Sequence, residues 1–155
     1  MPEFQVLATP EDVARAAADQ IVAALDGGAR TLVLAGGNTP KRCYELLAGA
    51  EVRWGRVTVL FVLLGAGEDG HTASLFPGHP EVQATGFAVG VRNAPKPPPD
   101  RVSLTLPALQ GARRVIVLAT GAGKADAVAR ARRGEVPSGM IAGALWLLDR
   151  AAAGQ

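Results

Sequence analysis

Three apolar runs, each ending in a glycine-containing polar loop, place the tightest constraint on how this chain can fold. They lie at residues 31–35, 57–65 and 113–121, and they lead into the loops GGNTP, GAGEDGH and TGAGK. Continuous apolar runs of this kind are typical of strands that are covered on both faces, as in a parallel sheet. The sequence therefore predicts buried parallel strands with polar loops at their ends.

Helical patterns alternate with these runs. Residues 9–28 begin with Thr9 as a helix cap and Pro10 at the first helical position, and they end at Gly27–Gly28. Further helices are predicted over 41–50, 122–134 and 144–154, and weaker strands over 87–91 and 101–107. Alternating strands and helices predict an α/β fold, a three-layer sandwich with a mostly parallel sheet.

Composition excludes several classes of protein. A chain of 155 residues with 48% apolar and 19% charged residues has the size and composition of one globular domain. Its formal net charge is only +2, and no basic run is interleaved with aromatic residues, so no nucleic-acid partner is predicted. The first residues lack the features of a signal peptide, and no apolar run reaches membrane-spanning length. The expectation is a cytoplasmic protein with no membrane partner.

A metal site is not predicted. The only histidines are His71 and His79, eight positions apart, and Cys43 is the single cysteine. Cys43 lies in a helical pattern where a small buried apolar residue fits, so a structural role is favoured over a reactive one.

The loop GGNTP is compatible with anion binding. Backbone N–H groups of Gly36 and Gly37 could approach an anion closely, Asn38 and Thr39 add side-chain donors, and the following helix presents its positive end. The loop matches neither a Walker motif nor a dinucleotide fingerprint. A plain turn between a strand and a helix is the alternative.

Two cations are candidate phosphate ligands. Lys124 lies near the start of a predicted helix, where its charge opposes the helix dipole and an anionic ligand would offset that effect. Arg101 follows the stiff segment PPPD and has the guanidinium geometry that suits phosphate. The alternative for both is a solvated side chain.

The loop GAGEDGH carries the strongest catalytic signal. His71 lies within three positions of Glu68 and Asp69, and a histidine beside carboxylates can act as a general base or acid. Gly67 and Gly70 allow a tight loop and could present N–H groups to a developing oxyanion. Because ligands bind beyond the carboxyl ends of parallel strands, three such loops together predict a site.

Four sequence blocks resemble a known family. LAGGNTPKRCYELL, VLLGAGEDGHTASLFPG, DRVSLTLPAL and VIVLATGAGKADAV occur in this order and are similar to the signature blocks of the 6-phosphogluconolactonases. The resemblance implies hydrolysis of 6-phosphogluconolactone to 6-phosphogluconate in the pentose phosphate pathway. It also implies a modified Rossmann-like sheet of the kind shared with sugar-phosphate isomerases.

The resemblance also implies roles for individual residues. His71 would activate water for attack on the lactone carbonyl, with Asp69 and Glu68 orienting or tuning the loop. The residues implied to hold the sugar-phosphate lactone are Gly36, Gly37, Asn38, Thr39, Gly67, Gly70, Arg101 and Lys124. Neither a cofactor nor a metal is implied, and a monomer or weak homodimer is expected.

One departure from the family pattern affects these expectations. WGRVTVLF, residues 54–61, joins directly to VLLGAGEDGH, so the family's Asp-Glu-Arg motif and the segment after it are missing. The expectation is a single domain over 1–155, shortened near 60–62, with one strand fewer. The alternatives are a catalytically impaired sugar-phosphate-binding remnant, a chain that does not fold stably, or an amino-sugar-6-phosphate isomerase or deaminase. Residues 72–77, TASLFP, favour the lactonase over the deaminase.

Overall fold

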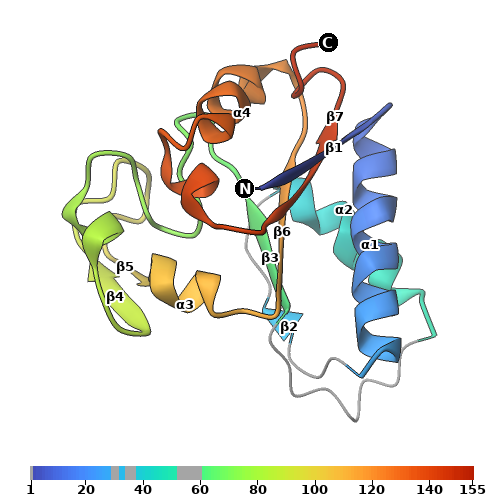
Figure 1. Cartoon of the computed structure of the whole chain (residues 1–155), viewed down its shortest axis with the longest axis horizontal. Helices are drawn as coiled ribbons and strands as arrows, with labels where there is room; N and C mark the ends of the chain where they lie inside the picture. The colour runs from blue at the N-terminus through green and yellow to red at the C-terminus, as the bar shows by residue number, and fades with distance from the viewer. Residues whose placement is uncertain (1, 29–31, 34–37, 52–60) are drawn as a thin grey trace.

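A five-stranded parallel sheet lies at the centre of the molecule (Figure 1). The computed structural model describes residues 2–28, 32–33, 38–51 and 61–155. In the described part of the chain the order of the sheet is β1-β7-β6-β3-β2, and every neighbouring pair is parallel. The strands are β1 (Glu3–Leu7), β2 (Leu32–Val33), β3 (Phe61–Gly65), β6 (Arg114–Ala119) and β7 (Leu145–Asp149).

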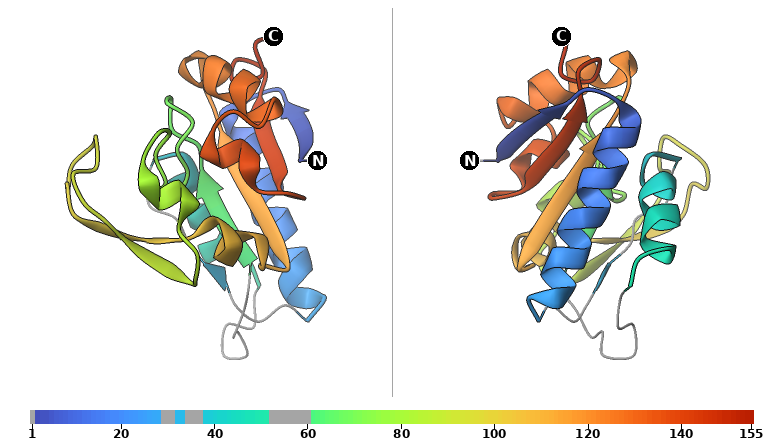
Figure 2. Two further views of the ribbon diagram at one scale, coloured as in Figure 1. Left: turned by 60° about the vertical axis from the view of Figure 1, so that its left-hand side comes forward. Right: turned by 90° about the vertical axis from the view of Figure 1, so that its right-hand side faces the viewer.

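Helices cover both faces of this sheet, so the predicted three-layer α/β sandwich is confirmed (Figure 2). One face carries α1 (Pro10–Asp26) and α2 (Asn38–Ala48), which pack side by side. The other face carries α3 (Leu106–Gln110), α4 (Ala125–Arg132) and the short 3-10 helix η4 (Pro137–Met140). No helix in these described ranges is both long and apolar enough to cross a membrane.

Alternating residues of the central strands supply the two cores. Leu63 of β3 and Ile116 and Leu118 of β6 pack toward α1 and α2, whereas Val62 and Val117 belong to the opposite core. All five are at most 1% exposed. Because helices cover both faces, no position on these strands needs to be polar, which explains the continuous apolar runs. Burying a side chain of this size contributes about 1.5–3 kcal/mol.

Helix α1 forms as its sequence predicts. The Thr9 hydroxyl accepts a hydrogen bond from the Asp12 N–H at 3.2 Å, and the Asp12 carboxylate accepts one from the Thr9 N–H at 3.1 Å. This capping box satisfies two of the donors that a helix start leaves free. Val13, Ala17 and Ile21 form the buried stripe of the helix.

The prediction of a helix over 144–154 is wrong. Residues Leu145–Asp149 form β7, which lies between β1 and β6 and is buried along its whole length. A short apolar run does not distinguish a buried strand from a buried helix, and pairing on both edges decides it here. Its partner β1 was not predicted as a strand, because its residues are partly exposed and lack a clear pattern.

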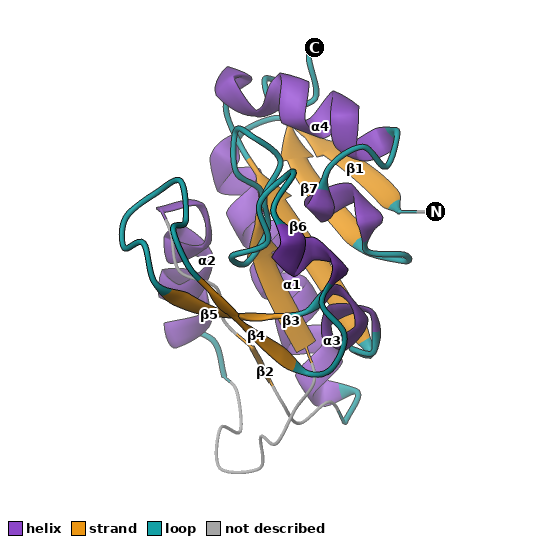
Figure 3. Cartoon of the chain, turned by 90° about the vertical axis from the view of Figure 1, so that its left-hand side faces the viewer, coloured by secondary structure: helices purple, strands orange, loops and turns teal. Residues whose placement is uncertain are grey.

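The weaker strand predictions over 87–91 and 101–107 correspond to a separate hairpin. β4 (Ala88–Val91) and β5 (Arg101–Leu104) pair antiparallel and form their own two-stranded sheet, beside α3 in Figure 3. The second prediction extends too far, because Thr105 caps α3 by accepting a hydrogen bond from the Ala108 N–H at 3.2 Å. The sheet of the sandwich is therefore wholly parallel over its described strands, and the antiparallel pair lies outside it.

The remaining predicted elements lie where expected, with shifted bounds. Residues 113–121 contain β6, and 122–134 contain α4, which follows a 3-10 turn at Ala122–Lys124. Helix α2 begins at Asn38, three residues before the predicted start. Of the runs 31–35 and 57–65, only the parts in β2 and β3 fall within the described residues.

Replacing Thr9 with Ala is expected to lower the free energy of unfolding by about 1 kcal/mol, because the N-terminus of α1 loses its side-chain cap. Urea unfolding followed by circular dichroism measures the change. Thr9→Ser is the matched control, since it keeps the hydroxyl and should retain most of the stability. Equal losses in the two variants would show that the methyl group of Thr9, rather than its capping hydroxyl, stabilises the helix.

Candidate functional site

The carboxyl ends of two neighbouring strands bring two of the predicted loops together. β3 and β6 are paired in parallel, so the segments that follow Gly65 and Ala119 leave the sheet at the same edge (Figure 1). The two loops touch, since a Cβ atom added at Gly123 would lie 3.4 Å from Glu68 Oε1. Glu68 thus lies against the loop that carries Lys124. Ligands of parallel sheets bind at this edge, beyond the carboxyl ends of the strands.

A histidine–aspartate pair lies in the first of these loops. His71 Nδ1 is 2.5 Å from Asp69 Oδ1, and the same oxygen accepts the His71 backbone N–H at 3.1 Å. The His71 side chain is 17% exposed and the Asp69 side chain 36%. When the Asp69 carboxylate accepts Nδ1–H, the neutral ring keeps its lone pair on Nε2. The pair therefore has the form of an oriented general base.

Glycines allow this pair to form. A Cβ atom at Gly67 would collide with the His71 ring and with the Asp69 carboxylate, so no larger residue fits beneath the pair. Gly70 has φ of +87°, and a Cβ atom there would lie 2.6 Å from Val136. The Gly67 N–H donates to the His71 carbonyl at 2.9 Å, and the Gly70 N–H to the Gly67 carbonyl at 3.0 Å. Both groups thus hold the loop in shape, and their role as oxyanion donors stays a prediction.

The His71 ring packs against an aromatic side chain that also contacts other polar groups. The Phe76 ring is buried, and its centroid lies 4.6 Å from that of His71. His79 lies 5.7 Å from the same ring, and the Arg101 guanidinium carbon lies 5.5 Å from its centroid. Phe76 therefore connects the loop that carries His71 with the strand that carries Arg101.

The surroundings shift the pKa values of both members of the pair. Burial lowers the pKa of His71, and the hydrogen bond and charge of Asp69 raise it. Positive charges on Lys96 and Arg101 lower it further, so the net pKa is below the ordinary value of 6.5. For Asp69, burial raises the pKa, but the contacts with His71 and the charge of Lys96 bring the net value below 3.8. At neutral pH the pair is a carboxylate beside a neutral imidazole.

The Arg101 side chain lies near the pair, but its guanidinium group donates hydrogen bonds to backbone carbonyl oxygens. Its guanidinium donates to the carbonyls of Lys96 at 2.6 Å, Pro97 at 2.8 Å and Pro98 at 2.9 Å. These bonds hold the proline-rich loop in front of β5. A phosphate role for Arg101 would have to coexist with this structural one.

Lys96 is a residue that sequence reasoning missed. Its side chain is exposed, and its positive charge acts on the pKa of both Asp69 and His71. The sequence feature that could have identified Lys96 is its position in the proline-rich segment that precedes Arg101. A cation at this position would attract an anionic substrate toward His71.

Lys124 lies where the sequence predicts, at the N-terminal end of α4. It is partly buried, it is the N-cap residue of the helix, and its N–H donates to the Gly121 carbonyl at 3.0 Å. The loop that contains Gly121 joins the end of β6 to the start of this helix.

Only part of the predicted phosphate loop GGNTP falls within the described residues. Gly36 and Gly37 lie outside the described residues, and Asn38 and Thr39 are the first residues of α2. The predicted turn over 36–40 is thus already helix at Asn38. The predicted substrate contacts of these four residues stay predictions.

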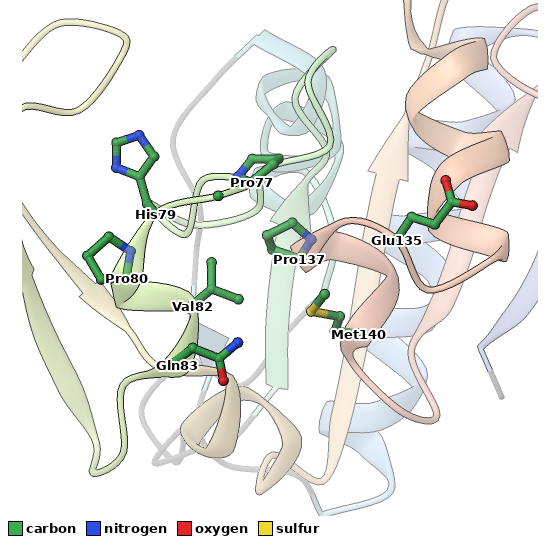
Figure 4. Close-up of a pocket in the computed structure, with 9 residues that line it drawn as sticks. Pro77, His79, Pro80, Val82, Gln83, Glu135, Pro137 and Met140 are labelled. Atoms are coloured by element: carbon green, nitrogen blue, oxygen red, sulfur yellow. The ribbon is translucent and has the colours of Figure 1, made fainter.

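A separate cavity of about 360 Å³ lies between the segment after Phe76 and η4 (Figure 4). His79, Val82 and Met140 help to line it, whereas His71 does not. Over the described ranges, no group of three or more His, Cys, Asp or Glu side chains could hold a metal ion.

Comparison with known proteins identifies the family. A family model described as glucosamine-6-phosphate isomerases/6-phosphogluconolactonase matches residues 61–147, which include the His71–Asp69 pair and Lys124. The chain belongs to this family. The resemblance inferred from the four sequence blocks is therefore confirmed.

Curated 6-phosphogluconolactonases are similar to the chain over part of their length. The Streptomyces coelicolor protein is 53% identical over an alignment of 102 residues that covers 61% of this chain and 39% of the relative. The Rattus norvegicus protein is 49% identical over an alignment of 100 residues that covers 59% of this chain and 39% of the relative. The matched part thus spans about two fifths of these relatives.

Solved structures of the isomerase and lactonase family share the fold. The 6-phosphogluconolactonase from Trypanosoma brucei superposes with a TM-score of 0.82 at 20% identity, covering 99% of this chain and 98% of that one. A monomeric glucosamine-6-phosphate deaminase superposes with a TM-score of 0.75 at 16% identity, covering 98% and 99%. Because both catalytic classes share this fold, the fold alone does not distinguish them.

The pKa of His71 is expected to move in opposite directions in two variants. Asp69→Asn should lower it further, because the ring loses the carboxylate that stabilises its protonated form. Lys96→Gln should raise it, because a repelling positive charge is removed. An NMR titration of the imidazole signals measures both shifts, and His79 in the same spectra is the internal reference. A rise in Asp69→Asn would contradict the pairing seen here.

Proposed function

We propose that this chain hydrolyses 6-phosphogluconolactone to 6-phosphogluconate. The observation that carries the proposal is the Asp69–His71 pair, a neutral histidine held by a carboxylate at the carboxyl edge of the sheet. Membership of the family supports the substrate class. The activity is a proposal because the matched segment covers about two fifths of the curated relatives.

In the proposed reaction, His71 Nε2 takes a proton from water, and the resulting hydroxide attacks the lactone carbonyl. The Asp69 carboxylate holds the ring through Nδ1 and stabilises the imidazolium that forms. As the tetrahedral intermediate collapses, the bond to the ring oxygen breaks and the imidazolium returns its proton to that oxygen. The product is the open-chain acid, and His71 ends in its starting form.

The electrostatics of the pair suit this role. A pKa of His71 below 6.5 keeps the ring neutral, and hence basic, at neutral pH. The charges on Lys96 and Arg101 that lower this pKa also favour approach of an anionic sugar phosphate. Glu68, on the same loop, lies against Gly123 and is proposed to set the distance between the two loops.

We assign the phosphate of the substrate to the start of α4. Lys124 lies at its N-terminus, where helix N–H groups and the dipole also favour an anion. Arg101, at the start of β5, is proposed as a second contact, with the part of its guanidinium that the carbonyls do not use. Gly36, Gly37, Asn38 and Thr39 are proposed to cradle the sugar.

A second candidate function is a sugar-phosphate-binding remnant without turnover. The observation that favours it is the direct junction of residues 54–61 with the strand before His71, which omits a segment of the family pattern. A deaminase is the third candidate, since a solved deaminase shares the fold. Internal shortening, a monomer or weak homodimer, and a cytoplasmic location stay predictions.

Hydrolysis of freshly prepared 6-phosphogluconolactone, corrected for spontaneous opening, is the test of the proposal. The wild-type protein is expected to hydrolyse the lactone, and His71→Ala is expected to lower kcat by a factor of about 10²–10⁴. The acid limb of kcat/KM is expected at a pKa below 6.5, because protonation of His71 removes the base.

The matched control is His79→Ala, which removes the other histidine of the chain while leaving Asp69 and His71 in place. Equal losses in the two histidine variants would remove His71 from the mechanism. Binding of 6-phosphogluconate without turnover by folded wild-type protein would favour the remnant. Release of ammonia from glucosamine 6-phosphate would favour the deaminase.

Replacing Lys124 with Ala is expected to raise KM, because the phosphate loses a charge-assisted contact that contributes roughly 1.5–3 kcal/mol. Arg113→Ala is the control, since it removes one exposed positive charge next to the start of β6, at the opposite end of that strand. Steady-state kinetics compare the two variants. A normal KM in Lys124→Ala would show that the phosphate binds elsewhere.

A further inference from the structure

Asp149 is a buried carboxylate that the proposed reaction leaves without a role. It is the last residue of β7 and is 3% exposed. Both of its oxygens lie 3.0 Å from the Gly121 nitrogen and accept its N–H, and Oδ1 also accepts the Ala152 N–H at 2.7 Å. A carboxylate removed from water is costly unless it is well bonded, and here backbone donors offset that cost.

The position of Asp149 suggests what these bonds accomplish. The ladder between β6 and β7 ends at the pair Ala119 and Leu148, so the two strands are already joined without Asp149. Its side chain extends this connection beyond the ladder, to Gly121 in the loop after β6. The carboxylate therefore restrains the loop rather than the sheet.

Gly121 in turn determines where helix α4 begins, and Lys124 is the N-cap residue of that helix. Gly121 has φ of +88°, a conformation that residues with side chains rarely adopt. Its carbonyl accepts the Lys124 N–H at 3.0 Å, so the two peptide groups on either side of the Gly121 Cα are both restrained, the first by Asp149 and the second by Lys124. Movement of Gly121 would displace the start of α4 and the Lys124 side chain with it.

We propose that Asp149 is a positioning residue that anchors Gly121 and thereby places Lys124 for the substrate phosphate. This inference rests on the proposed function of the site. It predicts that Asp149 affects binding of the phosphate and leaves the chemistry at His71 almost unchanged. It also predicts that the effect depends on Lys124 being present.

The experiment compares Asp149→Asn with the matched control Asp126→Asn. The amide of the first variant keeps one acceptor oxygen, but its NH₂ group opposes the Gly121 N–H. Asp126 is an exposed carboxylate in the first turn of α4, two residues from Lys124, so its variant removes the same charge without touching Gly121. Asp149→Asn is expected to raise KM for 6-phosphogluconolactone by about tenfold with kcat within about twofold. The control should stay within about twofold in both.

A double variant tests whether Asp149 acts through Lys124. In a Lys124→Ala background, Asp149→Asn is expected to change KM by less than about twofold, because residues that act as one unit are not additive. Hydrolysis of unphosphorylated gluconolactone should be the same in Asp149→Asn and Asp126→Asn as in the wild-type protein. Additive KM effects, an equal loss with the unphosphorylated substrate, or a fall in kcat alone would each overturn the proposal.

Two further measurements keep the inference testable if Asp149→Asn does not fold or the wild-type protein has no activity. Hydrogen exchange in the wild type should show a protected Gly121 amide, and rapid exchange at this position would overturn the anchor. Calorimetry with 6-phosphogluconate then separates the two proposals. If 6-phosphogluconate binds and its binding weakens in Lys124→Ala, the anion site is supported even without turnover. If 6-phosphogluconate does not bind, the proposed function is wrong, and hydrogen exchange at Gly121 alone tests the anchor.

Discussion

The parallel pairing of β3 with β6 is the constraint on which the rest of the structure depends. Both strands are buried on two faces, and their register brings Gly65 opposite Leu118 at the edge where the loops begin. Helices α1 and α2 close one face, and α3, α4 and η4 close the other. With both faces filled, polar groups can gather only beyond the strand ends, and the candidate site lies there.

Opposing influences define the state of the His71–Asp69 pair. Burial and nearby cations favour the neutral ring, whereas Asp69 favours the charged one, and the net result is a ring that can accept a proton. The pair is possible only because Gly67 has no side chain. One glycine thus links the backbone of the loop to the chemistry that the loop can perform.

Anchoring of the second loop follows a different principle. Its position depends on a carboxylate from β7, the strand that the sequence pattern assigned to a helix. Helix or strand could not be decided from a five-residue apolar run, since both bury such a segment equally well. The role of Asp149 could therefore not be foreseen, because it requires β7 to lie beside β6. Arg101 shows a similar limit, because its three carbonyl partners depend on how the proline-rich loop folds back.

Local sequence by itself determined the capped helix α1, the buried runs of β3 and β6, and the glycine-rich loops that follow them. These features depend on neighbours a few residues away, and capping residues, apolar periodicity and glycines report them directly. Only the tertiary structure decided the strand order, the identity of β7, the effect of the Lys96 charge on His71, and the contacts of Glu68 and Asp149 with distant loops. Those contacts join residues far apart in the chain, and no local pattern carries their geometry because the packing of the sheet creates it.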